Sequence, residues 1–312
     1  MNAAEYPPDS TIRARLEALR QPDEVVTPIV PDALAGGDWW PTARAWPRAL
    51  AAGVLEPRRG YRFRPENVGV AHLLQGMSAG TVMDLGAGSG SLLLLAGYLT
   101  CARRLVGIEL QADAVDRLRR TLLAHGLDGT VVCGDARSPE VRCGAAAAAE
   151  GKAQMVLLNP PFFPEGWGRP SNNPSTHLST HATHGGVGEL LAATAALLAP
   201  GGHVLVVYDA ARLAELLVAA AALQLGLERL AWIPDQRPGR AAQPFRVWAD
   251  FMAGQGLVAT RLSAGHPLPG LTGDPEAASR GSDDSAPGSS AQAPSAARRR
   301  EQSAGAPRPP QA

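Results

Sequence analysis

The chain has 312 residues, of which 45% are hydrophobic and 19% charged, enough apolar material to bury a sizeable core. Its 29 basic side chains balance its 29 acidic ones, so neither a wholly basic nucleic-acid-binding chain nor an acidic solvating chain is compatible with it. Three cysteines without CxxC spacing argue against a disulfide framework or a cysteine-based zinc site. Residues 1–20 lack an apolar signal segment, and no apolar run reaches about 18 residues, so we expect a cytoplasmic protein without membrane contact.

Composition divides the chain into three parts. Residues 1–59 form an N-terminal extension, with a short helix predicted at 11–21, and we expect it to pack on the main domain. Residues 60–255 form the main domain. Residues 256–312 are rich in Gly, Ser, Ala and Pro and have no apolar periodicity, so this C-terminal tail is predicted to be disordered.

The main domain alternates apolar runs with amphipathic segments. Strands are predicted at 81–87, 104–110, 130–136, 154–161 and 203–209, with helices at 89–99, 111–126, 186–200 and 210–226. Fully apolar strands are typical of a parallel sheet covered on both faces, and the alternation indicates a doubly wound, Rossmann-like α/β fold. Two further runs, 227–235 and 245–252, have no helix between them, so we expect them to pair as an antiparallel hairpin.

A cofactor site is predicted at the ends of the first three strands. The segment DLGAGSG contains Asp84 and three glycines that allow close backbone approach to a ligand, namely Gly86, Gly88 and Gly90. Glu109 ends the next strand, where a carboxylate can accept hydrogen bonds from both ribose hydroxyls. Asp84 suits an ammonium better than a pyrophosphate, and Asp135 ends the third strand, where an acidic side chain can accept a hydrogen bond from an adenine amino group. Helix capping is the alternative role of both aspartates, but together these residues favour S-adenosyl-L-methionine over a nicotinamide dinucleotide.

A reacting site is predicted directly after the fourth strand, where the strand order of a doubly wound sheet reverses. The carbonyls of Asn159 and Pro160 can each accept one N–H of a planar amine, which directs the nitrogen lone pair towards a methyl donor. Pro161 stiffens this corner, and Phe162 offers a face on which a flat base can stack. The loop that follows carries His177, His181 and His184, for which we favour surface or substrate contacts over a metal site.

From about residue 55 to residue 250 the chain resembles the bacterial tRNA1(Val) N6-adenine methyltransferase family. The likeness is carried by LEPRRGYRF, DLGAGSG, NPPFF and the end of the domain, IPDQRPGRAAQPFRVWAD. The resemblance implies a class I methyltransferase sheet of order 3-2-1-4-5-7-6. It also assigns the acidic and glycine residues above to the cofactor, the NPPF corner to the amine, and residues 59–63 to the approach to the cofactor pocket.

The substrate is left with alternatives. NPPF with Phe162 is more typical of guanine-N2 enzymes acting on ribosomal RNA, and a glutamine-N5 methyltransferase acting on a release factor shares the same chemistry. Residues 60–255 contain 16 basic and 16 acidic side chains, so the domain lacks the net positive field usual in RNA enzymes. We expect an S-adenosylmethionine-dependent N-methyltransferase that acts on adenine N6 in tRNA; the alternative from another class is a binding module with little turnover.

Overall fold

The computed structural model describes residues 9–30, 47–74, 76–161, 186–234, 244–254 and 261–263. The N-terminal elements are α1 (Asp9–Leu19), β1 (Glu24–Thr27), α2 (Ala49–Ala52), β2 (Val54–Pro57), a 3-10 helix at Pro65–Val70 and α3 (Ala71–Leu74). The central elements are β3 (Thr81–Leu85), α4 (Ser91–Thr100), β4 (Arg104–Glu109), α5 (Ala112–His125), β5 (Gly129–Cys133), α6 (Pro139–Ala148) and β6 (Ala153–Leu158). The last are α8 (Val187–Leu197), β7 (Leu198–Asp209), α9 (Leu213–Ala222), β8 (Leu225–Pro234), β9 (Pro244–Ala253) and β10 (Arg261–Ser263).

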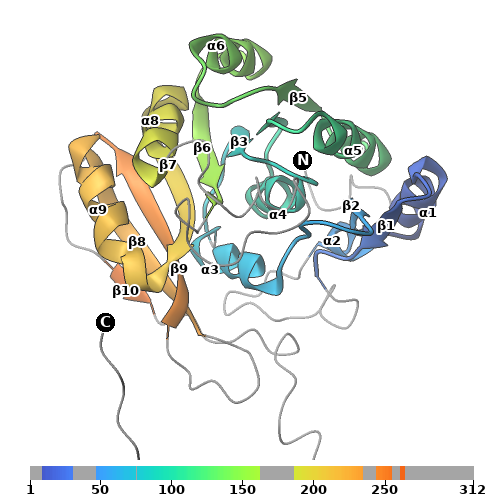
Figure 1. Ribbon diagram of the computed structural model, residues 1–312, viewed down its shortest axis with the longest axis horizontal. Coiled ribbons are helices and arrows are strands. Elements are labelled where there is room, and N and C mark those ends of the chain that lie inside the picture. The colour runs from blue at the N-terminus through green and yellow to red at the C-terminus, as the bar shows by residue number, and fades with distance from the viewer. Residues whose placement is uncertain are drawn as a thin grey trace, which may run out of the picture. The chain divides into compact units, whose positions relative to one another are not determined.

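One eight-stranded sheet organises the domain, in the order β10-β8-β9-β7-β6-β3-β4-β5 (Figure 1). Strands β3 to β7 pair in parallel, whereas β9 is antiparallel to both β7 and β8. Read from β5 to β8, this is the order 3-2-1-4-5-7-6, so the predicted doubly wound class and its antiparallel last pair are confirmed. The carboxyl ends of β3, β4, β5 and β6 therefore meet along one edge of the sheet.

Two described elements of this sheet region were not predicted. Helix α6 begins at Pro139 after Ser138, whose hydroxyl accepts a hydrogen bond from the Val141 amide at the helix start. Strand β10 lies within the segment 256–312 that we expected to be disordered, and it pairs in parallel with β8 at the sheet edge. The other residues of that segment lie outside the described part of the chain.

Alternate strand residues build two cores on opposite faces of the sheet. Val82 and Leu105 point to the face covered by α3, α4 and α5, whereas Met83 and Val106 point to the face covered by α6, α8 and α9. This alternation is what a parallel sheet buried on both sides requires. Among the described helices none is long and apolar enough to cross a bilayer.

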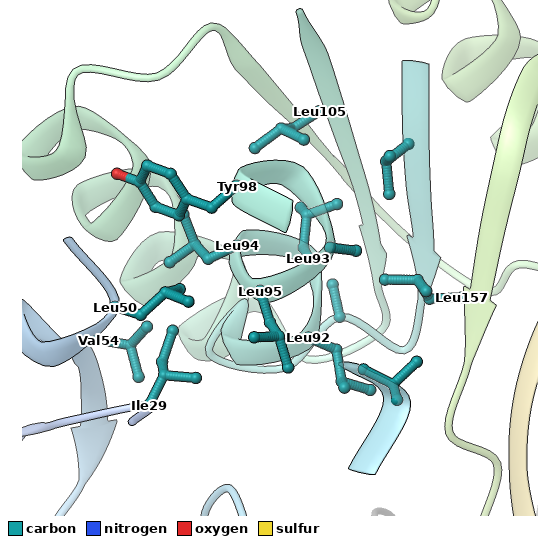
Figure 2. Packing of buried hydrophobic residues seen from close by; sticks show 14 of the residues in the cluster. Ile29, Leu50, Val54, Leu92, Leu93, Leu94, Leu95, Tyr98, Leu105 and Leu157 are labelled. Atoms are coloured by element: carbon teal, nitrogen blue, oxygen red, sulfur yellow. The ribbon is translucent and has the colours of Figure 1, made fainter. Parts of the chain in front are cut away.

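Helix α4 is buried between the sheet on one side and the N-terminal segment on the other. Its sequence SLLLLAGYLT is apolar all round, and such a helix must be buried on every side. Figure 2 shows the inner side of α4 facing Leu105 and Leu157 of the sheet, while Ile29, Leu50 and Val54 of the N-terminal segment lie against its other side. Residues before 60 therefore complete the core of this face.

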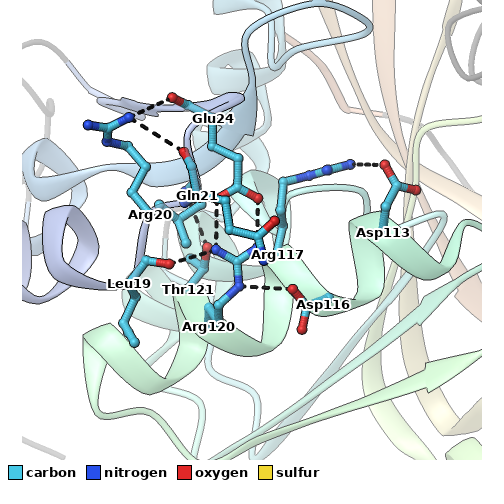
Figure 3. A network of polar contacts seen from close by, with 10 residues as sticks. Leu19, Arg20, Gln21, Glu24, Asp113, Asp116, Arg117, Arg120 and Thr121 are labelled. Carbon is cyan, nitrogen blue, oxygen red and sulfur yellow. Dashed lines mark hydrogen bonds and ion pairs between the residues drawn. The ribbon is translucent and has the colours of Figure 1, made fainter.

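A buried ion pair fastens the N-terminal elements to α5 (Figure 3). Glu24 of β1 is 1% exposed, and its two carboxylate oxygens accept hydrogen bonds from both terminal nitrogens of Arg120, at 2.6 and 2.7 Å. Arg120 also donates to the Leu19 carbonyl at 2.8 Å and pairs with Asp116. Because two-point contacts of this kind fix orientation as well as distance, they set the position of the β1–β2 hairpin against α5.

Candidate active site

A cavity opens where β3, β4, β5 and β6 end, and most of the predicted site residues line it. The residues predicted to bind the cofactor that line it are Asp84, Gly86, Gly88, Glu109 and Asp135. The residues of the predicted reacting corner that line it are Asn159, Pro160 and Pro161. Phe162 and the three histidines of the following loop lie outside the described residues. Several separate loops of the chain thus converge on one space, as the carboxyl edge of a doubly wound sheet allows.

The glycines of the turn after β3 have different structural roles. Gly88 has a φ of 54°, and a Cβ built on it would meet no atom within 4 Å, so the backbone there borders open cavity. Gly90 has a φ of 86° but does not line the cavity; a Cβ on it would lie 2.2 Å from Cδ1 of Leu118 on α5. Gly90 therefore allows α4 and α5 to pack closely. The two glycines that leave room for a ligand against the backbone are Gly86 and Gly88.

Glu109 lines the cavity and is held by backbone donors. Its Oε2 accepts a hydrogen bond from the Gly88 amide at 2.9 Å, and its Oε1 accepts one from the Gln111 amide at 2.8 Å. Each carboxylate oxygen keeps a further lone pair for a ligand hydroxyl. Burial raises the pKa of Glu109, the backbone donors opposing the shift.

Asp84 is 1% exposed and faces the same space from the end of β3. A hydrogen bond from the Leu93 backbone, in the first turn of α4, lowers the pKa of the Asp84 carboxyl group but does not outweigh burial. Its Oδ1 is buried and, among the described residues, has no hydrogen-bond partner. Burial and the nearby Glu109 charge raise the pKa of Asp84 to about 8. A buried acceptor without a donor is costly, which makes this oxygen a ready partner for a cationic ligand group.

Asp135 is engaged by a neighbouring cation. The Arg137 guanidinium forms an ion pair with Asp135 at 2.5 Å and a second one with Glu189 in the first turn of α8 at 3.0 Å. The two carboxylates raise the pKa of Arg137 further above its already high value. Arg137 thereby joins the loop after β5 to the start of α8, a link that the sequence did not reveal.

Asn159 gives the reacting corner its acceptor. The residue follows β6 directly, and its side-chain Oδ1 is buried with no hydrogen-bond partner in the described part of the chain. Pro160 is buried and Pro161 partly so, and neither can donate a backbone hydrogen bond. The corner therefore offers acceptor oxygens, with no donor from the two prolines.

The cavity has one wall that residue-by-residue prediction missed. Glu56 of β2 and Arg117 of α5 line it, together with Tyr61 and Phe63 from the segment that the resemblance had placed near the pocket. Glu56 is fully buried, and its Oε1 accepts a hydrogen bond from the Phe63 amide. Burial raises the pKa of Glu56. No spacing rule connects positions 56 and 117, and only the fold brings them together.

Comparison with known proteins supports a methyltransferase domain. Residues 67–168, which span the glycine turn and the asparagine–proline corner, match the family model described as "Methyltransferase small domain". The chain is 33% identical over 149 residues to the 4-amino-L-phenylalanine/4-methylamino-L-phenylalanine methyltransferase of Streptomyces pristinaespiralis, over 45% of this chain and 48% of that protein. It is 31% identical over 131 residues to the ribosomal RNA small subunit methyltransferase C of Pseudomonas aeruginosa, over 42% of this chain and 32% of that protein.

The chain thus spans about half or less of the length of these relatives. Among solved structures, a putative S-adenosylmethionine-dependent methyltransferase from Streptococcus mutans is 11% identical, with a TM-score of 0.49, over 75% of this chain and 56% of that one. The resemblance drawn from the sequence is confirmed at the level of a methyltransferase domain whose methyl donor is S-adenosylmethionine.

The residues present fit that donor. Its ammonium and sulfonium are cationic, and the cavity supplies the Glu109 carboxylate and the Asp84 oxygen, to which no described residue donates a hydrogen bond. Gly88 leaves the backbone uncovered, so a ligand can lie directly against the turn. Among the described residues no group of three or more His, Cys, Asp or Glu side chains has the arrangement of a metal site.

Proposed function

We propose that this protein is an S-adenosylmethionine-dependent N-methyltransferase acting on the exocyclic amine of a nucleic-acid base, with adenine N6 in tRNA as the first substrate to test. The observation that carries the proposal is the buried Oδ1 of Asn159, which has no hydrogen-bond partner among the described residues and lies in the same cavity as Asp84 and Glu109. A carbonyl oxygen desolvated in this way gains most from a ligand that brings an N–H donor.

The chemistry of an aryl amine explains why acceptors are needed. Its lone pair is delocalised into the ring, so the nitrogen is a poor nucleophile. In our proposal the Asn159 side-chain oxygen accepts one N–H and the Pro160 carbonyl accepts the other, which favours a tetrahedral nitrogen with its lone pair free to react. Phe162 follows the corner in sequence and supplies a stacking face for the base.

The donor supplies an electrophilic methyl group on a sulfonium; the nitrogen lone pair forms the new N–C bond while the C–S pair returns to sulfur. The chain's own residues bind and orient. Glu109 accepts the ribose hydroxyls, Asp84 accepts the ammonium, and Asp135 with Arg137 borders the adenine. The methylated nitrogen then loses one proton to water, so no buried general base is required.

The relatives support this reaction class and widen the choice of substrate. One relative is named as a methyltransferase of ribosomal RNA and another as a methyltransferase of 4-amino-L-phenylalanine. 4-Amino-L-phenylalanine carries an amine on a flat ring, as adenine and guanine bases do, and a group of this kind suits the corner described above. Guanine N2 in ribosomal RNA is therefore the nearest alternative, and the neutral charge of residues 60–255 favours a small aromatic amine as a second candidate.

The test is transfer of labelled methyl to separate acceptors: unmodified tRNA, ribosomal RNA, 4-aminophenylalanine and a release factor. We expect label in an RNA nucleoside, and Asn159→Ala to lower kcat by about 100-fold while donor affinity measured by calorimetry stays within about twofold. Gln154→Ala, which changes an amide outside the cavity, is the matched control. Labelling confined to protein, or full activity of Asn159→Ala, would overturn the proposal.

We further propose that residues 60–255 form the catalytic domain, with residues 1–59 as its extension and 256–312 as a tail outside the reaction. An acceptor of tRNA or ribosomal RNA would place the reaction in the cytoplasm.

A further inference from the structure

The cavity is lined by a buried arginine to which the proposed function assigns no role. Arg117 is 7% exposed, lies in the second turn of α5 and lines the cavity. Its terminal nitrogen Nη2 forms an ion pair with Oδ2 of Asp113 at 2.8 Å. Its Nε is buried and has no hydrogen-bond partner among the residues that the structure describes. A guanidinium held on one side and unsatisfied on the other is oriented for an oxygen ligand.

The charges of the cavity decide which ligand group this cation receives. Glu56 and Glu109 are buried carboxyl groups that would repel a second carboxylate. The other arginine of the described lining, Arg137, is already shared between Asp135 and Glu189. A carboxylate that enters this cavity therefore finds its favourable partner at Arg117.

Starting from the proposed function, on which this inference rests, we propose that Arg117 binds the α-carboxylate at the amino-acid end of the methyl donor. The carboxylate satisfies the Nε–H that the described residues leave unbonded, while Asp84 takes the ammonium of the same group. Arg117 lies within the family match, but the wall that buries it comes from β2, before that match begins at residue 67.

The carboxyl group of Glu56 offsets part of the free-energy cost of burying the Arg117 charge. Its carboxyl group shares the wall with Arg117, and the Arg117 charge opposes the rise that burial causes in the pKa of Glu56. Glu56 is itself held by the Phe63 amide at 2.6 Å, so the negative charge beside Arg117 is fixed by the backbone. The N-terminal extension thus contributes a fixed carboxyl group close enough to Arg117 for their charges to interact.

The experiment compares two ligands that differ in this carboxylate alone. Calorimetry measures the Kd of S-adenosylmethionine and of its decarboxylated form for the wild type, Arg117→Met, Arg117→Lys and Arg103→Met, the last being an exposed arginine that does not line the cavity. We expect the wild type and Arg103→Met to bind the decarboxylated form about 10- to 100-fold more weakly, as for a lost charged hydrogen bond. In Arg117→Met the two ligands should bind within about twofold of each other.

Each other outcome has a definite meaning. If the wild type binds both ligands equally, or if Arg117→Met weakens both ligands by the same factor, Arg117 does not receive the carboxylate and the inference is overturned. A wild type that binds neither ligand overturns the proposed function as well. If Arg117→Met keeps its donor affinity but requires more 4-aminophenylalanine to reach half of its maximal rate, the carboxylate is that of an acceptor, which also overturns the assignment. Should Arg117→Met fail to fold, Arg117→Lys is expected to retain a reduced discrimination between the two ligands, and wild-type discrimination there would refute the role.

Discussion

Replacing Gly90 with alanine tests whether the glycines of the turn after β3 have the separate roles that the structure gives them. The new Cβ would lie 2.2 Å from Cδ1 of Leu118, far inside van der Waals contact. Leu118 is fully buried and has little room to retreat, because a Cβ on Gly107 would in turn lie 2.7 Å from its Cδ2. The leucine is therefore wedged between two glycines, and overpacking of this kind costs about 1–3 kcal/mol.

The left-handed backbone at Gly90 adds about 1–2 kcal/mol for any residue with a Cβ, so Gly90→Ala should lower the free energy of unfolding by about 2–5 kcal/mol. Gly88→Ala is the matched control: it carries a similar backbone cost but meets no atom, so it should lose about 1–2 kcal/mol and weaken donor binding instead. Urea unfolding measures both. In a Leu118→Ala background the cost of Gly90→Ala should fall by the overpacking part, about 1–3 kcal/mol. Equal costs for the two alanines, or no coupling with Leu118, would refute the packing role.

Two further predictions concern charge. Because the pKa of Asp84 is raised to about 8, the ligand-free carboxyl group holds its proton below that pH. An ammonium selects the ionised form, so donor affinity should rise by up to about tenfold per pH unit as the pH rises from 6 towards 8. Calorimetry in buffers of different ionisation enthalpy should show the release of the proton. Affinity independent of pH, or the same slope in Asp84→Asn, would contradict this. Glu24→Gln leaves Arg120 without its buried partner and should cost about 3–5 kcal/mol in urea unfolding, whereas Glu17→Gln, in an exposed pair with Arg20, should cost below about 1 kcal/mol. Comparable losses in the two variants would show that burial does not set the strength of the Glu24 pair.

The regular part of the fold could be predicted because each strand and most helices carry their own local pattern. The strand TVMDL and the helix ADAVDRLRRTLLAH are recognisable from apolar run and amphipathic period alone, and the lack of a helical pattern between 235 and 245 indicated the antiparallel pair. Helix α6 escaped because its alanine run has no apolar period; its Ser138-Pro139-Glu140 start was the signal available. Strand β10 has three residues and gains its pairing from β8, so no local pattern marks it.

The site divides in the same way. Asp84, Glu109, Asp135 and Asn159 each follow or end a predicted strand, and parallel strands bring their carboxyl ends to one edge, so their common location followed from topology. Glu56 and Arg117 could not be found so, because they belong to a hairpin and a helix interior that lie far apart in the sequence.

The role of the N-terminal segment as cover for α4 and as a wall of the cavity has an evolutionary and practical consequence. The match to the family model starts at residue 67, but a polypeptide cut there would present the outer leucines of α4 to water and leave the cavity open beside Arg117. The segment that matches the family model is therefore shorter than the segment that must be present for the domain to fold. Damage to the described elements before residue 60 would consequently be felt as aggregation and lost methyl transfer together, although their task is to support the pocket and not to hold the acceptor.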